Sequence, residues 1–145
     1  MKAKITAFLC VFMVCLCSIA WAAISADAIS VDTDSSGDAT AYSGKTYNGV
    51  LKAIVYEKDN YANGVDFTIT SETTGQTLWT QSDVNASVIK YPLTQACSTA
   101  GVAATLNGTQ AMLVPIALFN ERIKIVIAQG GNATAGDFKF LVEGF

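Results

Sequence analysis

Two segments near the end of the chain, Arg122-Ile123-Lys124-Ile125-Val126-Ile127 and Asp137-Phe138-Lys139-Phe140-Leu141-Val142, decide the fold. In the first segment the isoleucines share one face, and in the second the phenylalanines and the valine do. Alternation with a period of two predicts two β-strands, each with one buried face. Gly and Asn punctuate the connection from residue 129 to 136, so the two strands are expected to form a β-hairpin.

Shorter alternating runs earlier in the chain predict further strands. Residues 65–70 alternate cleanly, and the turn residues 73–76 lead into a strand over 77–81, so these two runs are expected to form a hairpin. Residues 29–31 begin a first strand, and residues 39–42 are expected to pair back against it after an Asp-, Ser- and Gly-rich turn.

The region between these runs and the final pair is harder to assign. Residues 94–110 are rich in Ala, Thr and Gly without a clear period, and they are predicted to be a long connection. Residues 112–119 are apolar but contain Pro115, which indicates an edge strand or an irregular one. The whole pattern predicts an all-β fold, an antiparallel β-sandwich of about seven to nine strands formed by residues 29–145 as a single domain.

The N-terminus has the pattern of a secretory signal. Lys2 and Lys4 precede an apolar run over residues 5–19, which ends at Ala20-Trp21-Ala22. This pattern predicts a signal peptide over residues 1–22, forming a signal helix, followed by a short leader over residues 23–28. The alternative is an uncleaved membrane anchor, because the apolar stretch approaches the roughly 18 residues that can span a bilayer.

Charge excludes some classes of partner. Removal of residues 1–22 takes away Lys2 and Lys4, so seven of nine basic side chains remain against all twelve acidic ones, and the net charge changes from −3 to −5. Nucleic-acid binding needs a basic patch to neutralise phosphates, so no nucleic-acid partner is expected. Anionic membranes are disfavoured for the same reason, and no stable membrane association is expected after signal cleavage.

Residue types also limit the chemistry. The chain has no histidine, and Cys97 is the only cysteine outside residues 1–22. The usual Ser-His-Asp and Cys-His catalytic systems and the common zinc sites are therefore excluded, and no intrachain disulfide can form in the domain. The carboxylates Asp59, Asp66, Glu72 and Asp83 are interpreted as solvated surface charge rather than a glycosidase pair. No catalytic residue and no cofactor are expected.

Two groups of residues are candidates for binding. Asp32-x-Asp34-x-Ser36-Gly37 matches the first half of an EF-hand loop and Asp38 adds another carboxylate, which suggests a calcium site, although Ser43 stands where the loop's last glutamate belongs. An ordinary tight turn without an ion explains the same residues. The second group is a hypothetical partner-binding surface, formed by the aromatic residues Trp79 and Tyr61 and by Val50, Ile54 and Tyr56 from a run that is apolar on both faces.

Four strings of sequence carry a resemblance to a known group of proteins. They are Asp34-Ser35-Ser36-Gly37-Asp38-Ala39-Thr40, residues 63–70 (NGVDFTIT), residues 75–87 (GQTLWTQSDVNAS) and residues 120–131 (NERIKIVIAQGG). With these strings the chain resembles small uncharacterised proteins of tailed bacteriophages and prophages, over about residues 29 to 143.

The resemblance implies a non-enzymatic virion structural or accessory β-sandwich of the head or head–tail region. Its expected partners are other copies of itself or other virion proteins, and its expected location is the virion. The alternative interpretation starts from the signal: an exported bacterial β-sandwich, periplasmic or extracellular, that binds a glycan or a cell-surface partner through its aromatic residues.

Overall fold

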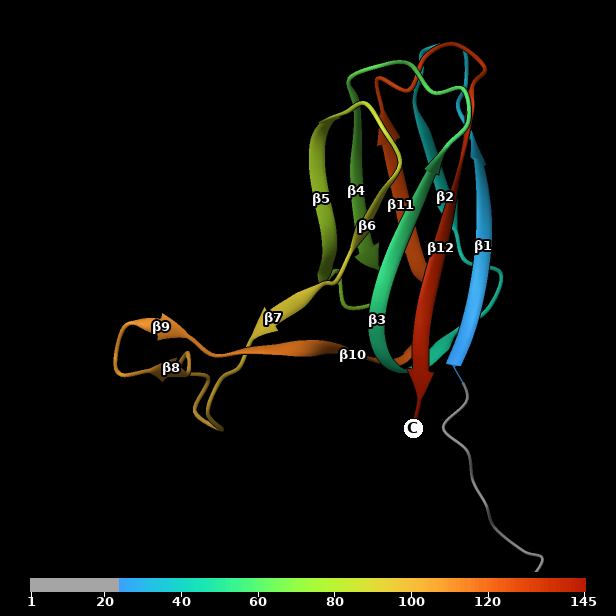
Figure 1. Ribbon diagram of the computed structural model, residues 1–145. Coiled ribbons are helices and arrows are strands. Elements are labelled where there is room, and N and C mark those ends of the chain that lie inside the picture. The colour runs from blue at the N-terminus through green and yellow to red at the C-terminus, as the bar shows by residue number, and fades with distance from the viewer. Residues whose placement is uncertain (1–23) are drawn as a thin grey trace, which may run out of the picture.

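The computed structural model describes residues 24–145, so the predicted signal peptide lies outside the described residues. These residues form twelve strands and no helix (Figure 1), and hence contain no helix that could cross a membrane. The strands are β1 (Ile24–Asp32), β2 (Ala39–Tyr42), β3 (Tyr47–Lys58), β4 (Val65–Ser71), β5 (Thr77–Val84), β6 (Val88–Lys90), β7 (Leu93–Gln95), β8 (Thr105–Leu106), β9 (Gln110–Ala111), β10 (Leu113–Glu121), β11 (Ile123–Ala128) and β12 (Ala135–Gly144).

The strands form two facing layers and a protruding element (Figure 1). The first sheet has the order β1-β12-β3-β10-β7, with β6 also paired to β3, and the second has the order β2-β11-β4-β5. A separate two-stranded sheet, β8-β9, belongs to the protruding element. The pairing is antiparallel throughout, which confirms the predicted all-β antiparallel architecture. The strand count exceeds the expected seven to nine because β6 to β9 are strands of two or three residues.

The first strand begins earlier than the sequence indicates. β1 starts at Ile24, which pairs with Glu143 of β12, so residues 24–28 of the predicted leader belong to the strand. Exposed and half-buried residues alternate along 24–30. This alternation is that of a sheet edge with one solvated face.

The two segments that decide the fold are strands, but they do not pair with each other. β11 lies between β2 and β4 in the second sheet, and β12 lies between β1 and β3 in the first. The predicted hairpin is therefore wrong. Each strand buries one face, as expected, and the two faces meet across the core because the loop over residues 129–134 carries the chain from one sheet to the other.

The predicted pairing of the first strand with residues 39–42 is wrong for the same reason, since β1 and β2 also lie in different sheets. The hairpin predicted for β4 and β5 is confirmed. Its turn is short and contains Gly75 at φ 69°, a conformation that glycine adopts at little cost.

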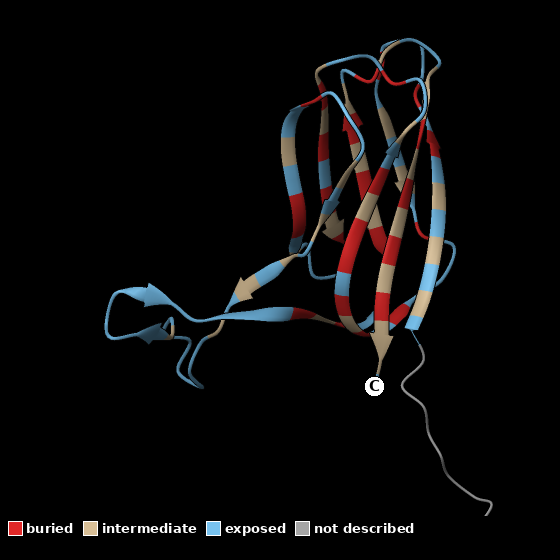
Figure 2. Cartoon of the chain, viewed as in Figure 1, coloured by how far each residue is buried: buried red, intermediate tan, exposed pale blue. Residues whose placement is uncertain are grey.

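Side chains from both sheets form one continuous core. The largest fully buried side chains are Tyr56, Phe67, Phe138, Phe140, Leu51, Ile54, Ile69, Ile116, Leu118, Ile123, Ile125 and Ile127. Buried and outward positions alternate along the strands in Figure 2. Phe67 is central, because its ring packs edge-on against Tyr56, Phe138 and Trp79 at centroid distances of 4.6, 5.1 and 5.4 Å. Such edge-to-face pairs add to the stabilisation that burial supplies.

Tyr61 closes one end of this core from the loop between β3 and β4. Its hydroxyl donates a hydrogen bond to the carbonyl oxygen of Val31. Its ring lies over Gly136, where an added Cβ would meet a ring carbon at 2.3 Å. An aromatic ring laid over a strand glycine supplies the packing that the glycine lacks. The position of the Tyr61 ring therefore requires glycine at residue 136.

Tyr56 differs from Tyr61 in one respect that makes a prediction. Its buried hydroxyl has no hydrogen-bond partner, and burial raises the pKa of Tyr56 to about 12. Tyr56→Phe is expected to leave the free energy of unfolding unchanged or raise it by about 1 kcal/mol, because an unpaired buried polar group costs stability. Tyr61→Phe is expected to lower it by about 1 kcal/mol through loss of the bond to Val31. Urea denaturation of both variants tests the contrast, and a larger loss in Tyr56→Phe would contradict it.

Candidate functional site

Most residues of the predicted partner-binding surface lie in the core. Ile54 and Tyr56 are fully buried, and Tyr61 and Trp79 expose 2% and 8% of their surface. Only Val50 faces outward, half-buried on the outer face of the first sheet. Four of the five residues therefore cannot form a partner surface. β3 has a β-bulge at Lys52, because the consecutive residues Leu141 and Val142 of β12 pair with Ala53 and Leu51. The bulge interrupts the alternation of β3, so Ala53 and Ile54 are both buried.

The predicted calcium loop is a hydrogen-bonded turn. One carboxylate oxygen of Asp34 accepts hydrogen bonds from the amide of Ser36 at 2.8 Å, from the Ser36 hydroxyl at 2.6 Å and from the amide of Asp38 at 3.2 Å. These donors hold the pKa of Asp34 below its usual value. Within residues 24–145 no three acidic, histidine or cysteine side chains come together as a metal site. The alternative interpretation, a turn made by Asp, Ser and Gly, accounts for Asp34 and Asp38, and Asp32 is the last residue of β1.

This turn supports the loop that joins the two sheets. The amide of Gly130 donates to the carbonyl oxygen of Gly37 at 2.8 Å, and the amide of Ala133 donates to the carbonyl oxygen of Asp34 at 3.2 Å. A Cβ on Gly37 would lie 2.9 Å from the backbone nitrogen of Gly131. The two loops are thus in direct backbone contact, which explains the glycines on both sides.

The carboxylates considered for catalysis do not converge. Glu72 forms a two-pronged ion pair with Arg122, with oxygen–nitrogen distances of 2.6 and 2.7 Å. Asp66 accepts hydrogen bonds from the amide of Asp83 at 3.0 Å and from the side chain of Gln129 at 3.1 Å. Glu72 lies at the opposite end of the β4–β5 hairpin from Asp66 and Asp83. Neither hollow found on the described residues is lined by any of these carboxylates.

Glu121 is the one acidic side chain that is buried among residues 24–145. It accepts a hydrogen bond from the amide of Thr73 at 3.1 Å. Hydrogen bonds from Ser71 and Thr73 hold the pKa of Glu121 below its usual 4.5, and the bonds from Arg122 do the same for the pKa of Glu72. Both groups anchor the turn between β4 and β5 to the start of β11.

These shifts predict a loss of stability in acid. A carboxyl group whose pKa is lower in the folded chain binds protons first in the unfolded chain, so stability is present above pH 4.5 and is lost as the pH falls below it. We expect Glu121→Gln to flatten this decline, as measured by thermal melting between pH 7 and pH 3. High salt should screen the exposed Glu72–Arg122 pair and leave the buried Glu121 contribution. An equally steep decline in Glu121→Gln would contradict the assignment.

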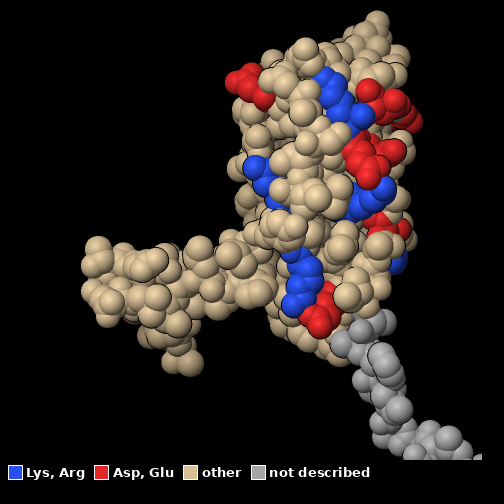
Figure 3. Space-filling view, viewed as in Figure 1, with Lys and Arg blue, Asp and Glu red and all other residues tan. Residues whose placement is uncertain are grey.

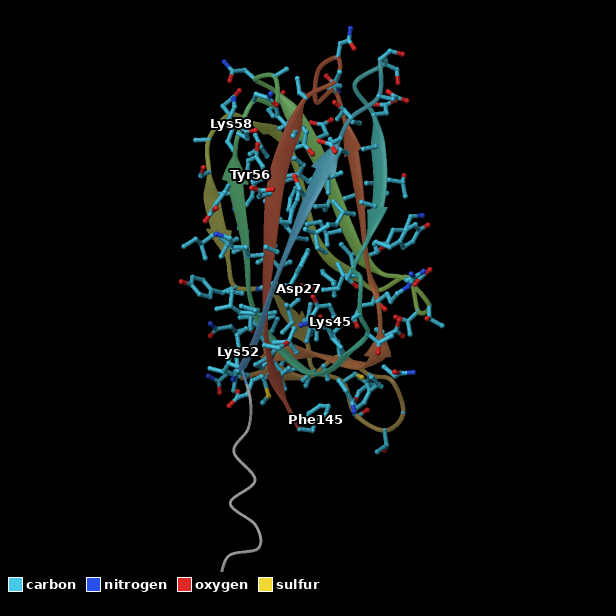
Figure 4. The ribbon with its side chains drawn as sticks, turned by 90° about the vertical axis from the view of Figure 1, so that its right-hand side faces the viewer. Asp27, Lys45, Lys52, Tyr56, Lys58 and Phe145 are labelled. Atoms are coloured by element: carbon cyan, nitrogen blue, oxygen red, sulfur yellow. The ribbon has the colours of Figure 1, made fainter. Side chains whose placement is uncertain are left out.

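Two shallow hollows mark the surface of the sandwich. The larger, about 330 Å³, is lined by Asp34, Asp38 and residues 126–128. The smaller, about 270 Å³, lies at the other end between Lys45, Tyr47 and Gly144. Figure 4 shows this second end, where Phe145 and Lys52 lie away from Lys58 and Tyr56. Neither hollow brings together a nucleophile and a base.

The most unusual feature is an arm that leaves the sandwich (Figure 1). We define the arm as residues 91–115, comprising β7 to β9 and the start of β10. No residue of the arm is buried (Figure 2). Its stem is the ladder between β7 and β10, in which Leu93 pairs with Pro115. The run 94–110, expected to be a plain connection, thus makes most of the arm, and Pro115 lies where β10 has left the main sheet.

Backbone hydrogen bonds give the arm its shape. The amide of Ala96 donates to the carbonyl of Met112 at 2.9 Å, Met112 donates to Ala104 at 3.0 Å, and Ala104 donates to Ala96 at 2.8 Å. This ring joins the stem to two turns, which lie at Ser98–Gly101 and Leu106–Thr109. The backbone of the arm is therefore regularly hydrogen-bonded, although none of its side chains is buried.

The arm and the part of β10 that follows it, up to Asn120, carry no charged side chain. Between Lys90 and Glu121 the sequence has thirty residues without Asp, Glu, Lys or Arg, and the arm shows no charged side chain in the view of Figure 3. It exposes several large apolar side chains, namely Tyr91, Leu93, Val102, Leu106, Met112, Leu113 and Val114. This charge-free run is visible in the sequence and is the signal that could have located the arm.

No known protein family, curated protein or solved structure matches the chain. The resemblance to phage proteins thus stays a hypothesis, and the arm is the candidate functional site.

Proposed function

We propose that this chain is a non-catalytic structural or accessory protein of phage type, which acts through protein–protein contacts made by its arm. One observation carries the proposal: residues 91–115 have regular backbone structure, yet none is buried and none is charged. A two-stranded hairpin is at best marginally stable alone in water. A partner protein that covers such an arm would stabilise it and give it a function.

The composition of the arm favours protein as its partner. Protein interfaces are depleted of charge at their centre and enriched in aromatic residues and methionine. Tyr91 and Met112 are exposed on the arm, and small polar residues lie between its apolar ones. Nucleic acid does not fit, because the arm offers no basic side chain to neutralise a phosphate.

Protein assembly fits these observations better than glycan binding does. The aromatic residues considered for a glycan, Trp79 and Tyr61, are buried. A stacking platform for a sugar needs an exposed ring. The exported glycan-binding alternative therefore cannot use these two rings.

Fractionation of phage particles tests the proposal. Particles released from a culture that carries the gene would be separated on a density gradient, and each fraction probed for this chain by quantitative mass spectrometry. We expect several copies of the chain in the fractions that contain phage DNA and capsid. Recovery only as free protein, or only in an exported fraction, would contradict the phage-structural role.

A further inference from the structure

We propose that Asn107, in the outermost turn of the arm, is a site of spontaneous deamidation through a cyclic imide formed with Gly108. The chain has three Asn-Gly steps, at residues 48–49, 63–64 and 107–108. Glycine has no Cβ, so it allows its backbone nitrogen to approach the preceding side chain with little hindrance. Because the three steps share this local sequence, the structure around each step decides which of them reacts.

The reaction needs only the chain and water. The backbone nitrogen of Gly108 loses its proton and attacks the Cγ of Asn107, so that a new C–N bond forms. The side-chain nitrogen takes up a proton and leaves as ammonia. Water then opens the cyclic imide at either of its carbonyl carbons. The products are aspartate and isoaspartate, and both replace a neutral amide by a carboxylate.

The step at residues 63–64, in the loop between β3 and β4, is held by hydrogen bonds. The amide of Gly64 donates to Oδ1 of Asn85 at 2.8 Å, and Oδ1 of Asn63 accepts from Nζ of Lys58 at 2.6 Å. Asn85 is itself fixed, because its side-chain amide donates to the carbonyl oxygen of Asp83 at 2.9 Å. Attack at Asn63 would therefore require two hydrogen bonds to break first.

The step at residues 48–49 is held by the first sheet. Gly49 is buried in β3 and is paired on both sides, with Leu118 of β10 and with Gly144 of β12. The Asn48 side chain is exposed, but the amide that must attack it lies inside the sheet. Attack would take Gly49 out of both ladders. Central strands open only at a free energy close to that of global unfolding.

The step at residues 107–108 lacks both kinds of restraint. It lies in the turn between β8 and β9, at the outer end of the arm (Figure 1). Both residues are exposed, and nothing lies within 4 Å of a Cβ built on Gly108. Among the hydrogen bonds of residues 24–145, none engages the amide of Gly108 or the side chain of Asn107. The turn is closed only by the amide of Thr109, which donates to the carbonyl oxygen of Leu106 at 3.2 Å.

The end of the arm also opens at little cost. β8 and β9 have two residues each, and no residue of the arm is buried. A two-stranded ladder of this kind is marginally stable, and segments with few buried contacts open without unfolding of the rest of the protein. The turn can therefore reach the conformation in which the nitrogen of Gly108 meets the Cγ of Asn107, while the sandwich stays folded.

Deamidation would change the character of the arm. A carboxylate at residue 107 would be the first charge between Lys90 and Glu121. An unpaired charge is costly to bury. Where a partner covers the arm, the modified chain would bind that partner more weakly. This consequence rests on the proposed function, whereas the reaction itself does not.

Peptide mapping of the aged protein tests the site. The purified chain would be kept in mildly alkaline buffer, and samples would be digested with trypsin and analysed by mass spectrometry. Cleavage after lysine and arginine places the three steps in separate peptides, 46–52, 59–90 and 91–122. We expect Asn107 to deamidate about tenfold faster, or more, than Asn63 and Asn48, because each hydrogen bond that must first break slows the reaction severalfold. Isoaspartate should accompany aspartate at residue 107.

Two variants and a denatured sample are the controls. Asn85→Ala frees the amide of Gly64, so it should speed the reaction at Asn63 and leave Asn107 unchanged. Gly108→Ala should slow the reaction at Asn107, because the added methyl group hinders the attacking nitrogen. In concentrated urea the three asparagines should react at similar rates. Equal rates in the folded chain, an order of rates that persists in urea, or aspartate without isoaspartate at residue 107 would overturn the inference.

Discussion

Replacement of Gly49 by alanine is expected to destabilise the protein more than any other single methyl addition. Gly49 lies in β3, between β10 and β12. An added Cβ would lie 2.1 Å from the carbonyl oxygen of Glu143 and 2.9 Å from the Cα of Gly144. Backbone atoms cannot rotate away as a side chain can, so the end of β12 would have to separate from β3. We expect the free energy of unfolding to fall by about 3 kcal/mol or more.

Two other glycines provide matched controls. Gly44 has nothing within 4 Å of an added Cβ, so Gly44→Ala should be neutral or slightly stabilising. Gly75 also has open space but lies at φ 69°, so Gly75→Ala should cost about 1–2 kcal/mol from conformation alone. Denaturant midpoints of the three variants separate steric contact from backbone strain. If Gly49→Ala were no worse than Gly75→Ala, the close approach of β3 and β12 would be contradicted.

The second large effect is expected at Phe67. Its ring contacts Tyr56, Phe138 and Trp79 and joins the two sheets. Phe67→Ala should lower the free energy of unfolding by about 3–5 kcal/mol, because it removes the buried ring and leaves a cavity. Domains of this size are typically stable by about 5–15 kcal/mol, so much of the total would be lost.

Phe119→Ala is the control for this change, because the same side chain is removed from an exposed site. Its unfolding free energy should stay within about 0.5 kcal/mol of wild type. Chemical denaturation of both variants would thus compare the loss of a buried ring with the loss of an exposed one. A Phe67→Ala protein as stable as Phe119→Ala would contradict the assignment of the core.

Alternation of apolar and polar residues determines some features of this fold and not others. It identifies the buried faces of β11 and β12 correctly, because side chains of a strand alternate whichever strand lies beside it. It does not identify the partner strand. The loop after β11 contains left-handed residues at Gln129, Gly131 and Ala133 and rests on the Asp34 turn. These contacts direct the chain into the other sheet, and they depend on residues about a hundred positions earlier.

Two features of the fold place the predicted surface aromatics in the core. Tyr61 lies in the loop between β3 and β4, where it turns inward to close one end of the core. Trp79 lies in β5, where a β-bulge lets Leu78 and Trp79 both face the core. The arm lacks both a period and an amphipathic face, since no part of it is buried. Patterns that arise from burial cannot reveal it, whereas its lack of charge can.

The position of β12 determines when the fold can form. This strand comes last in the chain but lies second in its sheet, between β1 and β3, and residues as distant as Ile24 and Glu143 are paired. During synthesis β1 must therefore wait for almost the whole chain before it gains a neighbour. Sheets closed by such distant pairs fold slowly, on the order of milliseconds to seconds. The first sheet should accordingly stay open in the nascent chain until β12 leaves the ribosome.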